Sequence, residues 1–185
     1  MEKNNHQEQF FRDFTRAFGY YVHMRKLILV CGPAAIGKST WSKNYITAHP
    51  EETVFILAAD EVRKEMFGGY DKFPPNKNMM VVYEEMVEIA HRLAKENENL
   101  TLIIDTTMLY DERRLYFKRH LPEFDTMVLA LLKLHDYTKC LERNRLRPQE
   151  KWVPEEVIVN MWNHYMDPSP STAEHFSEVL EIYVD

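Results

Sequence analysis

The sequence has few of the features that mark secreted, membrane-spanning and zinc-binding proteins. Its 185 residues include only two cysteines, Cys31 and Cys140, and no CxxC pair, which argues against a disulfide framework or a cysteine-ligated zinc site. The longest apolar runs, such as 27–31 and 127–132, are far shorter than the roughly 18 residues needed to cross a membrane. The first residues lack the apolar centre of a signal peptide. We therefore expect a soluble, cytoplasmic protein that makes no membrane contact.

An excess of positive charge is also absent. The chain has 23 Lys and Arg against 29 Asp and Glu, a formal net charge of −6, so any contact with nucleic acid must come from a local patch. With 45% hydrophobic residues and neither repeat nor linker, residues 1–185 are expected to form a single domain. The segment 1–25 is expected to be a helical extension whose aromatic stripe is Phe10, Phe11, Phe14, Phe18 and Tyr21.

Short apolar runs alternate with longer stretches of helical character. The runs expected to be strands are 27–31, 54–57, 100–105, 126–134 and 179–184. Helices are expected to begin near Gly37, Glu61, Asn78, Asp111, Asp136 and Pro154. This alternation predicts an α/β protein with a parallel five-stranded sheet flanked by helices on both faces.

Glycine is scarce, yet two of the five glycines, Gly32 and Gly37, lie within six residues of each other in the segment from Gly32 to Ser39. This segment, GPAAIGKS, matches the pattern G-x-x-x-x-G-K-[ST], and it follows an expected strand and opens an expected helix, as a phosphate-binding loop does. In such a loop the backbone N–H groups surround the phosphates, Lys38 reaches the β- and γ-phosphates and the Ser39 hydroxyl ligates Mg²⁺. Many small kinases have glycine where this chain has Ala35, so a positive φ there would strain the backbone.

Two acidic residues follow the next expected strands. Asp60 would lie at the carboxyl edge of the sheet, where it could act as a general base toward an attacking hydroxyl, with Arg63 on the same side of the helix to hold a substrate anion. The alternative is that Asp60 only caps that helix. Asp105 ends the apolar run 100–105 in a Walker-B-like pattern, which predicts a role in holding Mg²⁺.

Arginines cluster near the expected fifth helix. Between Lys133 and Lys151 there are six Lys and Arg against three acids, a local charge of +3. Arg143 and Arg147 are four residues apart, so both would point to one side of a helix and could neutralise triphosphate charge from a lid. The alternative is a solvated basic helix. Arg113 and Arg114 are expected to be structural or solvated.

Together these segments resemble the kinase domain of phage polynucleotide kinase, one of the AAA_33 and zeta-toxin-like P-loop kinases. The resemblance covers roughly 27–166 and rests on the segments GPAAIGKST, LAADEVRKEM, LIIDTTMLYDERR, CLERNRLRP and WVPEEVIVNMW, in the same order and with similar spacing. It implies a P-loop NTPase fold with an arginine-bearing lid. The phosphatase half of the phage enzyme, with its DxDxT motif, has no counterpart in this sequence.

The resemblance also implies roles for the matching residues. Asp60 would activate a 5′-hydroxyl, Arg63 would hold the acceptor's phosphate and Asp105 would help to build the acceptor site. Lys38, Asp60 and Arg147 would be catalytic, and Ser39 and Asp105 would hold the metal. The residues expected to bind the nucleotide, ATP or GTP with Mg²⁺, are Gly32, Pro33, Ala34, Ala35, Ile36, Gly37, Lys38, Ser39, Thr40, Arg143 and Arg147.

The resulting prediction is a kinase that transfers the γ-phosphate to a hydroxyl, with a polynucleotide 5′-OH end as the leading acceptor. A small hydroxyl compound, such as an antibiotic, a nucleotide sugar or a metabolite, is the alternative acceptor on the same fold. An ATPase or switch without an acceptor would instead use Asp60 to orient water. Both DNA and RNA ends fit the pattern, and nothing in it bears on the oligomeric state.

Overall fold

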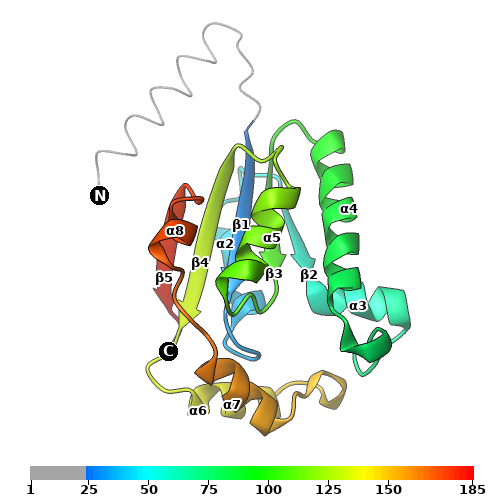
Figure 1. Ribbon diagram of the computed structural model, residues 1–185, viewed down its shortest axis with the longest axis vertical. Coiled ribbons are helices and arrows are strands. Elements are labelled where there is room, and N and C mark those ends of the chain that lie inside the picture. Colours follow the sequence, from blue (N-terminus) through cyan, green and yellow to red (C-terminus); the bar gives the residue numbers. More distant parts are fainter. Residues whose placement is uncertain (1–23) are drawn as a thin grey trace, which may run out of the picture.

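The computed structural model describes residues 24–185, and its five strands form one sheet in which all paired strands are parallel. The sheet order is β2-β3-β1-β4-β5, which confirms the predicted parallel five-stranded sheet (Figure 1). The strands are Arg25–Cys31 (β1), Val54–Ala58 (β2), Leu100–Asp105 (β3), Thr126–Lys133 (β4) and Glu178–Tyr183 (β5). The aromatic stripe expected between Phe10 and Tyr21 lies outside the described residues.

Strand β1 is at the centre of the sheet because both of its faces are apolar. Leu27 and Leu29 belong to one hydrophobic cluster, whereas Ile28 and Val30 belong to another on the opposite face. All four side chains are at most 2% exposed. Alternate residues of a strand point to opposite faces, so a continuous apolar run is what a strand covered on both sides requires.

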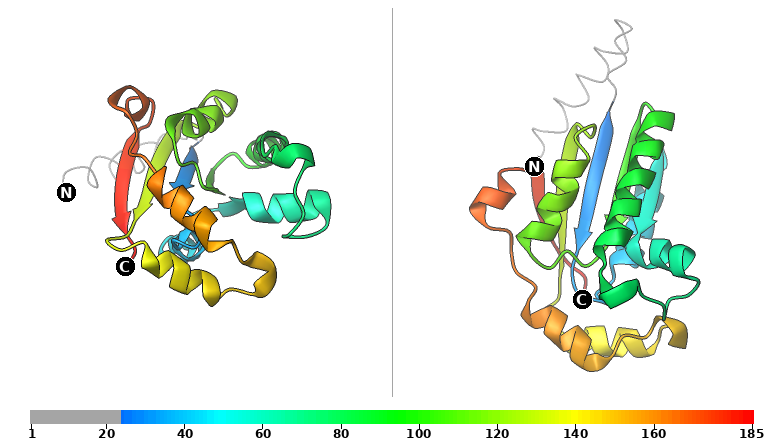
Figure 2. Two further views of the ribbon diagram at one scale, coloured as in Figure 1. Left: turned by 60° about the horizontal axis from the view of Figure 1, so that its bottom comes forward. Right: turned by 45° about the vertical axis from the view of Figure 1, so that its right-hand side comes forward.

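Helices cover both faces of the sheet. Figure 2 shows α4 and α5 on one face and α2 on the other, while α6 and α7 lie beyond the ends of the strand arrows in Figure 1, at the carboxyl edge. The helices of eight residues or more are Lys38–Ala48 (α2), Ala59–Phe67 (α3), Met80–Glu96 (α4), Asp111–His120 (α5), Thr138–Arg145 (α6) and Glu155–Asn163 (α7). Among residues 24–185, no helix is long and apolar enough to span a bilayer.

The structure differs from the predicted elements in several places, of which three bear on the argument. Helix α3 begins at Ala59, two residues early, so Asp60 belongs to its first turn. Three short helices were not predicted: Pro75–Lys77 (η1), Gln149–Lys151 (η2) and Pro170–Ala173 (α8). Helix α6 ends at Arg145, so the expectation that Arg143 and Arg147 share one helix face is wrong, because Arg147 lies two residues beyond the helix.

Candidate active site

The phosphate-binding loop connects β1 to α2 at the carboxyl edge of the sheet. Its backbone passes through positive φ at Gly32 (148°) and Gly37 (121°), where a side chain would be strained. A Cβ atom on Gly32 would also lie 3.0 Å from Ile36 Cγ2 and 3.3 Å from the Leu132 carbonyl oxygen. The Gly32 N–H donates to the Thr107 carbonyl at 3.0 Å, which fixes the start of the loop against the end of β3.

Ala35 has a φ of 60°, in the left-handed region. The sequence raised this possibility because alanine stands where a further glycine is common. An L-residue in this region is strained by roughly 1–2 kcal/mol because its Cβ approaches the following carbonyl oxygen. The loop therefore has the left-handed turn in spite of this alanine, and the strain lowers the protein's free energy of unfolding.

Lys38 lies within electrostatic reach of the other charged residues of the site. Its ammonium group donates to the carbonyls of Gly32 at 2.9 Å and Pro33 at 2.8 Å. Desolvation lowers the pKa of Lys38, while the negative charges of Asp105 and Asp60 oppose that shift and the positive charge of Arg147 adds to it. Of the predicted catalytic residues, Asp60 and Arg147 are thus each close enough to Lys38 to act on it electrostatically.

Ser39 and Asp105 meet at the expected metal position. The Ser39 hydroxyl donates to Asp105 Oδ2 at 2.7 Å, and Asp105 is only 7% exposed at the end of β3. Residues 24–185 contain no group of three or more His, Cys, Asp or Glu side chains that could hold a metal ion. One hydroxyl and one carboxylate nevertheless suit Mg²⁺, which takes its remaining ligands from phosphates and water.

Asp60 is accessible and is not the cap of helix α3. The N-cap position is Ala58, and no side chain caps the helix. The Asp60 side chain is 59% exposed and forms an ion pair with Arg63, in which Nη2 lies 3.1 Å from Oδ1. The alternative of a purely capping role is therefore unsupported, and the carboxylate is available to a molecule in solution.

Arg63 organises the segment after α3. Its Nη1 donates to the carbonyls of Tyr70 and Lys72, both at 2.7 Å, and its guanidinium lies 4.2 Å from the centre of the Phe73 ring. The residue is 6% exposed, and its Nε has no hydrogen-bond partner within residues 24–185. The predicted contact with the acceptor's phosphate therefore stays a prediction, since two loop carbonyls already occupy much of the guanidinium.

The clustered arginines have different surroundings. Arg143 donates to the Ile36 carbonyl of the phosphate loop at 2.6 Å and also to the Val184 carbonyl, so it braces that loop against the end of β5. Arg145 pairs with Glu155 of α7 through Nη2 and Oε1, 2.7 Å apart. These contacts bring Arg143 to the expected nucleotide site, but they do not show a lid.

Residues 27–168 match a family described as an AAA domain, AAA_33, and this match covers most of the chain. The chain belongs to this family. The family match confirms the predicted relationship to AAA_33 P-loop kinases. No protein among the curated sequences gave a significant match.

Solved structures resemble this AAA domain in fold. A chain of the Pnkp1/Rnl/Hen1 RNA repair complex aligns over 84% of this chain and 47% of its own length, with 18% identity and a TM-score of 0.63. A gluconokinase from Sinorhizobium meliloti 1021 aligns over 86% and 82%, with 15% identity and a TM-score of 0.54. Kti12 from Chaetomium thermophilum, in complex with ADP-AlF3, aligns over 86% and 89%, with 14% identity and a TM-score of 0.59. This AAA domain thus spans about half the length of the RNA repair chain and has a P-loop NTPase-like fold.

The loop after β3 in this AAA domain is held by a residue whose importance the sequence did not reveal. The prediction left open whether Arg114 is structural or solvated. Arg114 is fully buried, and it donates to the carbonyls of Met108, Leu109 and Met166 and to the carboxylate of Asp111. Met108 is also fully buried, and its φ of 41° is unusual for a non-glycine residue. The adjacent arginines in the sequence gave no sign of which one points inward.

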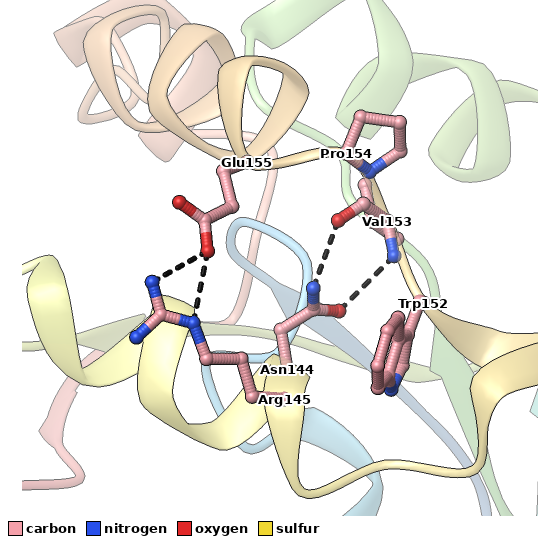
Figure 3. A pocket seen from close by; sticks show the side chains of 6 residues that line it. All are labelled: Asn144, Arg145, Trp152, Val153, Pro154 and Glu155. Atoms are coloured by element: carbon pink, nitrogen blue, oxygen red, sulfur yellow. Dashed lines mark hydrogen bonds and ion pairs between the residues drawn. The ribbon is translucent and has the colours of Figure 1, made fainter.

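A cavity of about 510 Å³ lies between α6 and α7 of this AAA domain and contains none of the predicted site residues (Figure 3). The Asn144 side chain closes one wall by donating to the Val153 carbonyl and accepting from the Val153 N–H, at 2.8 and 3.1 Å. The cavity is lined by Asn144, Arg145, Trp152, Val153, Pro154 and Glu155. It is therefore a feature of the covering helices, separate from the phosphate loop.

Proposed function

We propose that this protein is a kinase that uses Mg²⁺ and ATP, or GTP, to transfer the γ-phosphate to a hydroxyl group. The observation that carries the proposal is the meeting of Lys38 and Ser39 of the phosphate loop with two carboxylates, Asp60 and Asp105, at one edge of the sheet. Phosphoryl transfer needs bound phosphates, a metal position and a group that accepts the proton of the attacking hydroxyl. These residues supply all three.

Each of these residues has a separate task. Lys38 and the loop N–H groups would hold the β- and γ-phosphates, and Ser39 and Asp105 would hold Mg²⁺, which neutralises charge on the phosphates. Asp60 would accept the proton of the acceptor hydroxyl, a role that its exposed carboxylate permits. Arg63, paired with Asp60, would orient that carboxylate.

A polynucleotide 5′-OH end is the leading acceptor. The order and spacing of the five motif segments support it, because all of them match one polynucleotide kinase domain. The similarity in fold to a chain of an RNA repair complex is consistent with that choice.

A small hydroxyl compound is the second candidate. The net charge of −6 and the fold similarity to a gluconokinase of comparable length favour it. An ATPase without an acceptor uses the same phosphate loop, with water in the place of the alcohol.

The test is transfer of labelled γ-phosphate from ATP in Mg²⁺ to a 5′-OH oligonucleotide, beside a panel of nucleosides, sugars and antibiotics. Asp60→Asn should lose at least about a hundredfold in kcat while its affinity for ATP is kept. Glu65→Gln, an exposed carboxylate on the same helix, should behave as wild type. Labelling of the oligonucleotide that weakens as salt rises supports the leading acceptor.

The remaining outcomes decide between the alternatives. Labelling of a small compound alone would overturn the polynucleotide assignment and leave the kinase in place. Hydrolysis of ATP with no labelled acceptor would favour the ATPase. An Asp60→Asn variant with near-normal turnover would remove the general-base role of Asp60.

A further inference from the structure

A three-residue cluster joins the two sides of the candidate active site. The Lys151 ammonium lies 2.9 Å from Glu61 Oε1, and the Tyr70 hydroxyl donates to the same carboxylate at 2.6 to 2.7 Å. Lys151 also lies 4.2 Å from the centre of the Tyr70 ring, a cation–π distance. Glu61 and Lys151 are 90 residues apart in the sequence, so the cluster joins α3 to the segment that follows α6.

The segment on the Lys151 side is closed on itself. Trp152 Nε1 donates to the Arg147 carbonyl at 2.7 Å, and the Lys151 N–H donates to the Pro148 carbonyl at 2.8 Å. These bonds form a compact turn, residues 147–152, that has Arg147 at its start and Lys151 next to its last residue. Figure 2 shows η2, within this turn, approaching α3 and the loop that follows it.

The Arg147 side chain is positioned by the backbone of the turn 147–152, and not by hydrogen bonds of its own to other described residues. Within residues 24–185 its side chain has no hydrogen bond or ion pair, yet its positive charge contributes to the lowered pKa of Lys38. On the other side of the cluster, Glu61 directly follows Asp60, the proposed general base. The cluster thus fixes the distance between the turn that presents Arg147 and the helix that presents Asp60.

We propose that Glu61, Tyr70 and Lys151 are positioning residues that hold the Arg147 turn against α3. They would keep Arg147, on the side of the nucleotide, at a fixed distance from Asp60, on the side of the acceptor. This inference rests on the proposed kinase function. Burial opposes the ionisation of Glu61, but its hydrogen bonds from Tyr70 and Lys151 outweigh this effect and lower its pKa, and the same contacts raise the pKa of Lys151. Both groups are therefore charged near neutral pH.

The first experiment needs no enzymatic activity. Trypsin is added to the full-length native protein, and cleavage of the bond between Lys151 and Trp152 is followed by mass spectrometry. Glu61→Gln and Tyr70→Phe should each increase the rate of this cleavage by roughly three- to tenfold, because the lysine is released from the cluster. Glu65→Gln, the same substitution elsewhere on α3, should leave the rate unchanged. Equal rates in all the variants and wild type would overturn the proposal.

The second experiment measures kinetics with the acceptor identified above. Glu61→Lys and Lys151→Glu should each lower kcat by roughly three- to tenfold while the KM for ATP changes less than twofold, because the phosphate loop itself is untouched. The double variant Glu61→Lys/Lys151→Glu restores opposite charges, so its kcat should exceed that of either single variant. A double variant whose losses simply multiply would contradict the positioning role. If wild type labels no acceptor, the proposed function fails, and the tryptic rates alone decide whether the cluster holds the turn.

Discussion

Replacing Ala35 by glycine should stabilise the protein, against the usual effect of adding a glycine. Ala35 has a φ of 60°, which is strained by roughly 1–2 kcal/mol for an alanine and unstrained for a glycine. Glycine also makes the unfolded chain more flexible, which costs roughly 0.4–1 kcal/mol. The difference lies between about 0 and 1.6 kcal/mol, so the central expectation is a gain of about 0.8 kcal/mol in the free energy of unfolding.

The neighbouring alanine provides a matched control. Ala34 is not among the residues with positive φ, and it packs against the hydrophobic cluster on the α2 face. Ala34→Gly should therefore lose about 0.5–1 kcal/mol through the flexibility of the unfolded chain, together with some packing. The two variants differ by one position and by the sign of the expected effect.

The assay is thermal and urea unfolding of wild type and both variants at pH 7, followed by circular dichroism. For a chain of this size, the gain in Ala35→Gly corresponds to an increase in Tm of about 1–4 °C. A decrease in Tm for Ala35→Gly as large as that for Ala34→Gly would show that the alanine is unstrained. The argument from φ would then be wrong for this loop.

Three further predictions concern groups outside the loop. Arg114→Met should lower the free energy of unfolding by about 3–5 kcal/mol in urea melts, because it leaves buried carbonyls without a donor; a loss below 1 kcal/mol would contradict this. Burial opposes ionisation of Asp111, but hydrogen bonds from Ser169 outweigh it and keep its pKa low, so its ionised form stabilises the fold above about pH 4. The penalty of Asp111→Asn should therefore shrink as pH falls below 4, and a penalty that is constant from pH 7 to 3 would refute the assignment. Burial raises the pKa of Cys31 to about 12, and burial also raises the pKa of Cys140. A thiol reagent at pH 8 should therefore label neither cysteine rapidly until denaturant is added.

Local patterns were enough to predict the sheet and the phosphate loop. The run from Leu27 to Cys31 is apolar at every position, and glycine spacing marked the turn after it. Such signals depend on neighbours in the sequence and on alternation between the faces of a strand. Ala35 could be flagged for the same reason, since a missing glycine is visible in the sequence.

Long-range contacts were not predictable in this way. The bond from Arg143 to the Ile36 carbonyl joins residues 107 positions apart, and it depends on where α6 lies over the edge of the sheet. Arg63 was expected to face an acceptor, but its Nη1 donates to the carbonyls of Tyr70 and Lys72, whose path after α3 no periodicity specifies. Positions of this kind follow from tertiary packing, which sequence patterns alone do not fix.

The central place of β1 has a consequence for the growing chain on the ribosome. Its partners are β3 and β4, so β1 lacks its first partner until synthesis has passed Asp105 and its second until synthesis has passed Lys133. Gly32 also needs the Thr107 carbonyl before the start of the phosphate loop is fixed. Such non-local pairing slows folding and leaves apolar strands exposed during synthesis. The phosphate loop is synthesised early, but it reaches its final conformation only after β3 and β4 have been made. A nascent chain released before Lys133 should therefore have no affinity for nucleotide.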